Sequence, residues 1–257
     1  MRIVTFDDIV QSTSKTATGS TNRRYIYRKY VKRLVESGKL RSIKKGLYAV
    51  LSPLEKPEKH ETEKLLIASK VRKEYYLGFH TALEYYGSAY SAFNDAYVCV
   101  QAKERFDPFS YGRFTFKPVF IKDLFSQIVE KPYGQSFLRV SSKERTFIEC
   151  IDKVQYAGGW EECTKSLAEL SGIDFEKLVT LTLDQRKQIL FRKVGYFLEF
   201  LRSRSPFYEH VSKDLLEQLT SRVKGSPQYL VRGEGGEINE RWRLYIPSDL
   251  EEKLKGI

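Results

Sequence analysis

The sequence predicts a mixed α/β (α+β) protein, in which an N-terminal winged helix-turn-helix of residues 1–51 precedes a larger mixed α/β domain of residues 61–257. Three observations lead to this prediction. In the first 51 residues a basic amphipathic segment is followed by two short strand-like segments. Residues 52–60 contain two prolines and four charged residues, which is typical of a linker. After this linker, segments with strand-like and helix-like patterns are interspersed to the end of the chain.

Positive charge is concentrated at the start of the chain. The 257 residues contain 44 Lys or Arg and 33 Asp or Glu, which gives a net charge of +11. Residues 1–51 hold twelve of these bases and three of the acids, a net +9, so the other 206 residues carry +2. A small module with this much charge of one sign is expected to bind an anionic partner such as nucleic acid.

The module is expected to begin with a short helix over residues 6–11. Thr5 precedes this helix as an N-cap, and Asp7 and Asp8 lie in the first turn, where carboxylates interact favourably with the helix dipole. Residues 12–19 are rich in Ser, Thr and Gly and are predicted to form a turn, with a single helical turn inside it as the alternative. Any second helix of a helix-turn-helix in this segment is therefore expected to be abbreviated.

A longer basic helix is expected to begin at Ser20 or Thr21 and to end at Ser37, with Gly38 as its C-cap glycine. On a helical wheel, apolar and basic side chains separate onto two faces. The predicted apolar face consists of Ile26, Tyr27, Tyr30, Val31 and Leu34, with Val35 at its edge. The opposite face consists of Arg24, Tyr25, Arg28, Lys29 and Lys32. Solvated helix faces usually mix charges of both signs, whereas only Glu36 opposes these bases, so an anionic partner is favoured over an ordinary solvated face.

The segment after the basic helix is predicted to be a two-stranded hairpin. Residues 40–43 and 47–51 are strand-like, and Lys44, Lys45 and Gly46 supply the turn, where the glycine permits a positive φ. Short helix, turn, basic helix and basic hairpin is the order of a winged helix-turn-helix. In that fold the helix enters the DNA major groove and the hairpin, or wing, contacts the flanking backbone or minor groove.

Eleven residues of the module are candidate contacts to double-stranded DNA. Arg can bond a guanine edge with two hydrogen bonds, so base contacts are expected from the first half of the helix. The base-contact candidates are Arg24, Tyr25 and Arg28. The phosphate candidates are Lys29, Lys32, Arg41, Lys44 and Lys45. Thr21 and Asn22 are expected to bring backbone N–H groups or a side chain to a phosphate at the helix start, and Arg23 belongs to the same set.

The larger domain is expected to contain both helices and strands. Helices are predicted over residues 61–75, 81–86, 142–154, 160–170, 175–181, 183–202 and 213–222, with a short last helix capped by Ser248. Strands are predicted over residues 96–101, 114–121, 137–140, 229–231 and 242–246, the last two paired across the glycine-rich residues 233–236.

Several segments resemble, in the same order, those of the AbiEi-type antitoxins, the DNA-binding halves of type IV toxin–antitoxin systems linked to abortive phage infection. The segments are residues 34–40 with 43–49, residues 75–87, residues 140–152, Gly158 with Gly159, and residues 241–245. The resemblance covers most of the chain. It implies a repressor of its own operon that binds an inverted-repeat operator in two copies. It also implies a functional link to a nucleotidyltransferase-like toxin, without a stable complex, in which the larger domain takes part in neutralisation.

Catalytic and metal-binding interpretations are less favoured, and we predict no enzyme activity, no cofactor and no metal. Asp95, Gln101 and Lys103 loosely match a metal-dependent nuclease pattern, but glutamine binds metal poorly. Glu144 and Arg145 are expected to contribute a structural ion pair between helix and sheet, because a catalytic site would need a second acid and a metal or base nearby.

Four further predictions concern residues outside the module. His80 is expected to be a buried histidine with its hydrogen bonds satisfied. Cys99, Cys150 and Cys163 are expected to be buried free thiols, because their spacing fits neither disulfides nor a zinc site. The tyrosine pairs 75–76 and 85–86 are expected in the core or an interface. The bases of residues 183–204 form either a solvated face or a second anionic contact; they are Arg186, Lys187, Arg192, Lys193, Arg202 and Arg204.

The cellular location of the protein is predicted from the absence of two sequence features, a membrane-spanning segment and a signal peptide. No apolar run is long enough for a membrane-spanning helix. The N-terminus carries Asp7 and Asp8 where a signal peptide needs an apolar stretch. We therefore expect a cytoplasmic protein.

Overall fold

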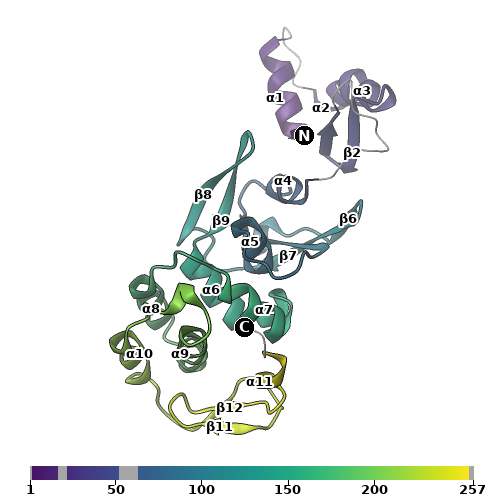
Figure 1. Ribbon diagram of the computed structural model, residues 1–257. Helices are drawn as coiled ribbons and strands as arrows, with labels where there is room; N and C mark the ends of the chain where they lie inside the picture. Colours follow the sequence, from purple (N-terminus) through teal and green to yellow (C-terminus); the bar gives the residue numbers. More distant parts are fainter. Residues whose placement is uncertain (1, 17–21, 52–62, 255–257) are drawn as a thin grey trace. The chain divides into compact units, whose positions relative to one another are not determined.

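A computed structural model describes residues 2–16, 22–51 and 63–254 and has the predicted α+β architecture (Figure 1). The strands of these residues form three sheets with the orders β1-β3-β2, β6-β7-β5-β4-β9-β8 and β10-β12-β11. The chain divides into two compact units. Unit 1 comprises Met1–Tyr76, Asn94–Leu124 and Lys131–Leu138, and unit 2 comprises Leu77–Phe93, Phe125–Glu130 and Arg139–Ile257. Within the described ranges, no helix combines the length and apolarity needed to cross a membrane.

The first part of unit 1 is a β-α-α-β-β module. Its elements are β1 (Arg2–Thr5), α1 (Phe6–Thr16), α2 (Arg23–Ile26), the π-helical turn η1 (Tyr27–Val31), α3 (Lys32–Glu36), β2 (Leu40–Lys44) and β3 (Leu47–Val50). Helix segments α2, η1 and α3 follow one another without a break, and we call residues 23–36 the basic helix.

The N-terminal capping prediction is confirmed. The Thr5 hydroxyl accepts a hydrogen bond from the Asp8 backbone N–H (3.1 Å), and the Asp8 carboxylate accepts one from the Thr5 N–H (2.8 Å). Helix α1 runs on to Thr16, so residues 12–16 are helical rather than the predicted turn. The Thr13 hydroxyl donates to the Ile9 carbonyl (2.7 Å), which satisfies this polar side chain within the helix. The rest of that turn, the helix start at Ser20 or Thr21, and the linker of residues 52–60 lie outside the described residues.

The hairpin is confirmed, and it gains a third strand that the sequence did not predict. β1 pairs antiparallel with β3, from Arg2 opposite Val50 to Thr5 opposite Leu47. Gly46 has φ +83° in the turn between β2 and β3. The core of the module consists of buried Val31, Leu40 and Tyr48, against which Val4, Phe6, Ile9, Leu34 and Val50 pack.

A π turn in the basic helix changes which side chains face this core. Ile26 and Val31 are 1% and 0% exposed although they are five residues apart. Five residues of an α-helix place two side chains about 140° apart, so in an α-helix these two would lie at opposite edges of the apolar face. In the π turn the Lys32 N–H bonds to the carbonyl of Tyr27, five residues back, which brings Ile26 and Val31 onto one side. Tyr27, predicted on the apolar face, is instead 47% exposed.

The remaining elements of unit 1 centre on a parallel strand pair. They are α4 (Lys64–Ser69), β5 (Asp95–Val100), η3 (Ala102–Glu104), β6 (Phe109–Tyr111) and β7 (Phe114–Phe120). β5 pairs parallel with β7, and β6 pairs antiparallel with β7. The strands β4 (Tyr76–Leu77), β8 (Ile128–Tyr133) and β9 (Ser136–Ser141) contribute residues to both units. The predicted helix of residues 61–75 is shorter in the structure, because the helix ends at Ser69 and residues 76–77 form a strand.

Unit 2 is mainly helical (Figure 1). Its elements are α5 (Phe79–Tyr86), α6 (Lys143–Asp152), η4 (Val154–Tyr156), α7 (Gly159–Ala168), α8 (Phe175–Asp184), α9 (Gln188–Arg202), η5 (Pro206–Tyr208), α10 (Lys213–Thr220), β10 (Gln228–Tyr229), β11 (Glu237–Asn239), β12 (Leu244–Ile246) and α11 (Leu250–Lys253). α6 packs against α5, α8 and α9, and α10 packs against α8 and α9.

Three sequence predictions for unit 2 need correction. The helix expected from residue 183 is broken before α9, because Arg186 adopts φ +52°, outside the helical region. The paired strands of residues 229–231 and 242–246 are confirmed as β10 and β12, but they run parallel, so they do not form a hairpin across the glycines. The last helix begins at Leu250 after Asp249, and Ser248 does not cap it.

Candidate nucleic-acid interface

The start of the basic helix is fixed by Asn22. Its carboxamide oxygen accepts hydrogen bonds from the backbone N–H groups of Arg24 (3.0 Å) and Tyr25 (3.2 Å). Two of the N–H groups that a helix leaves unpaired at its N-terminus are therefore already bonded within the chain. Thr21, the other predicted contact at this end, lies outside the described residues.

The outward face of the basic helix carries the predicted contact residues. Arg24, Tyr25, Arg28 and Lys29 are all exposed. Arg24 and Arg28 make no ion pair with any described residue, which leaves both guanidinium groups available for an external anion. Lys29 donates to the Tyr25 hydroxyl (2.7 Å), and its ammonium lies 5.1 and 5.4 Å from the ring centroids of Tyr25 and Tyr30. The hydrogen bond to Tyr25 raises the pKa of Lys29, so this side chain stays cationic.

Two other bases of the helix are held by acids. The Arg23 guanidinium lies 2.7 Å from the Asp7 carboxylate and 4.9 Å from the centroid of the Phe6 ring. The hydrogen bond from Arg23 lowers the pKa of Asp7. Lys32 lies 3.7 Å from Glu36, one turn further along the helix. Beside these two pairs, Arg24, Arg28, Lys29 and Arg33 are exposed bases of the helix without an acidic partner among the described residues.

The three predicted hairpin cations have different environments within unit 1. The Arg41 guanidinium lies 5.4 Å from the centroid of the Tyr111 ring. The Lys44 ammonium lies 4.4 Å from the centroid of the Phe109 ring, and burial together with the nearby Arg72 charge lowers the pKa of Lys44. Lys45 is exposed and makes no ion pair with a described residue. Among the hairpin cations, Lys45 therefore has its charge available for a phosphate.

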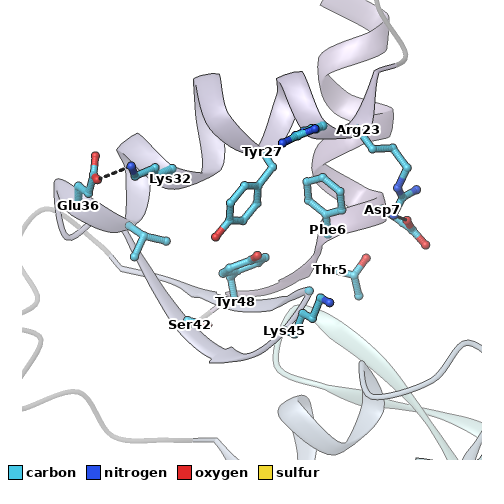
Figure 2. A pocket seen from close by; sticks show the side chains of 13 residues that line it. Thr5, Phe6, Asp7, Arg23, Tyr27, Lys32, Glu36, Ser42, Lys45 and Tyr48 are labelled. Atoms are coloured by element: carbon cyan, nitrogen blue, oxygen red, sulfur yellow. Dashed lines mark hydrogen bonds and ion pairs between the residues drawn. The ribbon is translucent and has the colours of Figure 1, made fainter.

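A groove of about 1250 Å³ lies between the basic helix and the hairpin (Figure 2). Its lining residues are Thr5, Phe6, Asp7, Arg23, Arg24, Tyr27, Lys32, Val35, Glu36, Ser42, Lys45, Gly46 and Tyr48. Figure 2 shows the rings of Phe6, Tyr27 and Tyr48 in the middle, with Asp7 and Glu36 at opposite ends. Sequence reasoning did not identify the groove. The one signal it offered was the five-residue spacing of Ile26 and Val31, which an α-helical wheel places at opposite edges of the apolar face.

The nuclease candidates do not come together. Asp95 forms an ion pair with Lys117 (2.6 Å), and Lys103 forms one with Glu74 (2.9 Å). Gln101 donates its amide to a backbone carbonyl (3.3 Å). Across residues 2–16, 22–51 and 63–254, no group of three or more His, Cys, Asp or Glu is arranged to hold a metal ion.

Glu144 and Arg145 make structural contacts, and the ion pair of Arg145 lies within α6 rather than between helix and sheet as predicted. Arg145 pairs with Glu149 on the same helix (2.7 Å) and donates to the Ser126 carbonyl. Glu144 accepts from the Asp174 N–H (3.2 Å) and lies 3.5 Å from Lys177, which links α6 to α8. The pair of Arg145 with Glu149, four residues ahead, is a local contact within one helix.

His80 is buried, as expected, and it belongs to a polar cluster within unit 2, but its hydrogen bonds are not all satisfied as predicted, because its Nδ1 has no hydrogen-bond partner among the described residues. Its Nε2 lies 3.0 Å from the Glu162 carboxylate, and its Nδ1 lies 3.5 Å from that of Glu84. The His80 and Phe93 rings stack with centroids 3.7 Å apart. Glu162 also accepts hydrogen bonds from the N–H (3.0 Å) and hydroxyl of Ser91. His80 and Glu162 are themselves buried, so their contact joins α5 to α7.

The bases after residue 185 do not form one exposed face. Arg192 is buried and donates to the backbone carbonyls of Ser226 (2.7 Å) and Arg243 (3.0 Å), so it holds the C-terminal segment against α9. Lys193 lies 5.1 Å from the Trp160 ring centroid, and burial lowers its pKa. A continuous anionic contact along this helix is therefore not supported.

The cysteine prediction is confirmed, and the tyrosine prediction is confirmed for Tyr75 and Tyr76, whereas Tyr85 and Tyr86 are only half-buried. Cys99, Cys150 and Cys163 are buried and free. Tyr75 and Tyr76 are buried in the core, and the hydroxyl of half-buried Tyr86 donates to the Ser141 carbonyl (2.7 Å).

Comparison with known proteins identifies a fold but no family. No protein-family model matches the sequence, and no curated protein matches it. Among solved structures, the chain is similar to the RV2827C protein from Mycobacterium tuberculosis, with a TM-score of 0.62 and 14% sequence identity. The similarity covers 95% of this chain and 86% of that one. At this level of identity it shows a shared fold alone.

Proposed function

We propose that the chain binds double-stranded DNA through its N-terminal module, with the basic helix in the major groove. The observation that carries this proposal is the outward face of that helix, on which the exposed Arg24 and Arg28 have no acidic partner among the described residues. Ordinary surface helices pair their charges along the chain, whereas a face of one sign suits the phosphate-lined major groove.

The proposed roles follow from where these side chains lie. Tyr25 and Arg28 occupy the first half of the helix, from which a helix in the major groove reaches base edges. Arg24 also lines the groove beside the hairpin, so it is assigned to a phosphate. Arg28 is the best candidate for a bidentate contact to guanine, because it is exposed and unpaired among the described residues. Lys29 and Lys45 are assigned to phosphates. Asn22 orients the helix, since its side chain already bonds the Arg24 and Tyr25 N–H groups.

The biological role is proposed from the resemblance to the AbiEi-type antitoxins. We infer a sequence-specific regulator, acting in the cytoplasm, that represses its own type IV toxin–antitoxin operon by binding an inverted repeat in two copies. A toxin gene of the nucleotidyltransferase class beside the gene of this chain would support this role. Its absence would leave a DNA-binding protein without the antitoxin function.

The experiment for DNA binding compares two duplexes in a gel-shift titration. One duplex is the DNA immediately upstream of the chain's own coding sequence. The other duplex has the same base composition in scrambled order. Specific regulators bind their sites about 10³- to 10⁷-fold more tightly than other DNA. Equal affinity for both duplexes would refute the specific-regulator proposal.

A second candidate function, neutralisation of a toxin by the larger domain, is favoured by the charge distribution. Residues 52–257 carry only +2 of the net charge, and Arg192 is engaged inside unit 2. The combined Arg24→Ala and Arg28→Ala variant of the full chain should lose operator binding. If it still rescues cells that express the toxin, neutralisation is independent of DNA binding. Loss of rescue in a folded variant would contradict this second function.

A further inference from the structure

We propose that the groove between the basic helix and the hairpin holds one strand of the bound duplex, with successive phosphates at Lys45 and Arg24. This inference rests on the proposed DNA binding and deepens it. It adds Tyr27 and Ser42 to the contact residues and gives the hairpin a defined place on the DNA backbone. The groove and its lining are drawn in Figure 2.

The charge of the groove leaves room for two anions. Of its four cations, Arg23 is paired with Asp7 at 2.7 Å and Lys32 with Glu36 at 3.7 Å. These pairs neutralise both acids that line the groove. The other two cations, Arg24 and Lys45, are exposed and make no ion pair with a described residue. Two uncompensated cations match two phosphates of a single strand.

The floor of the groove suits a sugar–phosphate chain better than bare phosphate. Val35 is 38% exposed and, with the half-buried Phe6 ring, gives the lining an apolar surface against which a deoxyribose can pack. Tyr27 is 47% exposed, and its hydroxyl makes no hydrogen bond to a described residue, so it can donate to a phosphate oxygen. The exposed Ser42 hydroxyl is a second donor in the lining.

The size of the groove favours a polymer over a small ligand. At about 1250 Å³ it exceeds the 300–1000 Å³ that is typical of small-molecule pockets, and it is open to solvent. The π turn is also the reason that the Tyr27 hydroxyl, a hydrogen-bond donor, lies in the middle of the groove. Because the Lys32 N–H bonds back to the Tyr27 carbonyl, Ile26 and Val31 fill the core, and Tyr27 faces the groove.

The test measures binding of a fluorescent upstream duplex to the full chain over a range of salt concentrations. Lys45→Ala should lower affinity about tenfold and reduce the magnitude of the log–log salt slope by about 0.9, the contribution of one phosphate contact. Tyr27→Phe keeps the ring and removes only the hydroxyl, so affinity should fall about threefold. Circular dichroism should show that both variants are folded.

The matched control is Lys39→Ala, an exposed lysine of the same module that does not line the groove. It removes the same charge from the module. Because Lys39 does not line the groove and contacts none of the phosphates proposed there, its removal should leave the salt slope unchanged. A set of duplexes, each with one neutral methylphosphonate, then locates the strand. At one position in the duplex, the methylphosphonate should weaken binding of the wild-type chain but should not weaken binding of Lys45→Ala further. In that variant the contact between residue 45 and this phosphate is already lost.

The outcomes separate this inference from the proposed function. If Lys45→Ala and Tyr27→Phe bind like Lys39→Ala, while Arg28→Ala still loses sequence preference, the groove does not hold the strand but DNA binding stands. Deoxyadenosine monophosphate binding as tightly as the duplex would also overturn the strand assignment. A wild-type chain without preference for its upstream duplex would overturn both.

Discussion

Replacing Glu162 by Gln should destabilise unit 2 more than its small change in shape suggests. The Glu162 carboxylate is 8% exposed and has four polar partners. It accepts from the Ser91 N–H (3.0 Å), the Ser91 hydroxyl and the Ser166 hydroxyl (3.0 Å), and it lies 3.0 Å from His80 Nε2. A carboxylate only accepts hydrogen bonds, so all four partners can point donors at it.

The expected magnitude follows from this geometry. Glutamine keeps one acceptor oxygen. Its NH₂ group replaces the second carboxylate oxygen, so N–H and O–H groups that donated to that oxygen now face another donor. Each hydrogen bond to a charged group contributes about 1.5–3 kcal/mol, and removing one partner of a buried pair costs about 3–5 kcal/mol. We therefore expect Glu162→Gln to lower the free energy of unfolding by about 3–5 kcal/mol. These energies are not additive, so the lower end is the safer figure.

Urea unfolding followed by tryptophan fluorescence measures this loss. Both tryptophans of the chain, Trp160 and Trp242, belong to unit 2, so the signal reports the unit that holds Glu162. The control is Glu161→Gln, which removes a charge from the neighbouring position. Glu161 is 53% exposed and pairs with Lys165, so its loss should cost at most about 0.5 kcal/mol.

The pH dependence has a definite sign. Burial alone would raise the pKa of Glu162, but the hydrogen bonds from Ser91, His80 and Ser166 outweigh it and lower the pKa below the ordinary value of 4.5. A lowered carboxyl pKa stabilises the fold above that ordinary value, and the contribution is lost as pH falls through the folded-state pKa. The gap between wild type and Glu162→Gln should thus be full at neutral pH and shrink below pH 4.5. A gap at neutral pH no larger than that of Glu161→Gln would refute the reasoning.

Three further substitutions have expected outcomes. Gly195→Ala would place a Cβ 2.0 Å from the buried Trp242 ring, whose Nε1 is bonded to Glu199 (2.6 Å), so the melting curve of unit 2 should show a loss of about 3 kcal/mol or more; a melting temperature equal to that of wild type would contradict this packing. Thr5→Ala removes the N-cap of α1 and should cost about 1 kcal/mol in urea unfolding followed by far-ultraviolet circular dichroism, whereas Thr5→Ser should cost less; equal effects would argue against the cap. Arg28→Ala should reduce discrimination between operator and scrambled DNA by about 1–3 kcal/mol in competition gel shifts; an unchanged ratio would remove Arg28 from base recognition.

Features set by local interactions could be predicted from the sequence. Thr5 and Ser142 cap the helices that follow them, and Gly38 and Gly46 have the positive φ expected after a helix and in a tight turn. The fold class and most elements also follow from local patterns, because helix and strand periods depend on near neighbours.

Features set by distant contacts could not be predicted. The His80–Glu162 contact joins residues 82 positions apart, and no local pattern specifies it. Arg192 sits in a helix rich in bases, yet carbonyl groups from another segment bury it. The π turn accompanies the burial of both Ile26 and Val31 and leaves Tyr27 47% exposed, so an α-helical wheel assigned Tyr27 to the wrong face.

The same distinction applies to the candidate site. The charge pattern indicated the outward face of the basic helix, because the sequence alone shows that bases lack nearby acids. The groove depends on how the hairpin packs against the helix, and β1, which the sequence did not predict, is part of that packing. Lys44 and Lys45 are adjacent and alike in sequence, but only Lys45 lines the groove.

The salt dependence of binding to the upstream duplex tests the central claim most directly. If the module neutralises about six to eight phosphates, the logarithm of the binding constant should fall with the logarithm of salt concentration with a slope of about −5 to −7. The scrambled duplex should bind much more weakly at every salt concentration. A slope near zero, or equal affinity for both duplexes throughout, would contradict DNA recognition by this module.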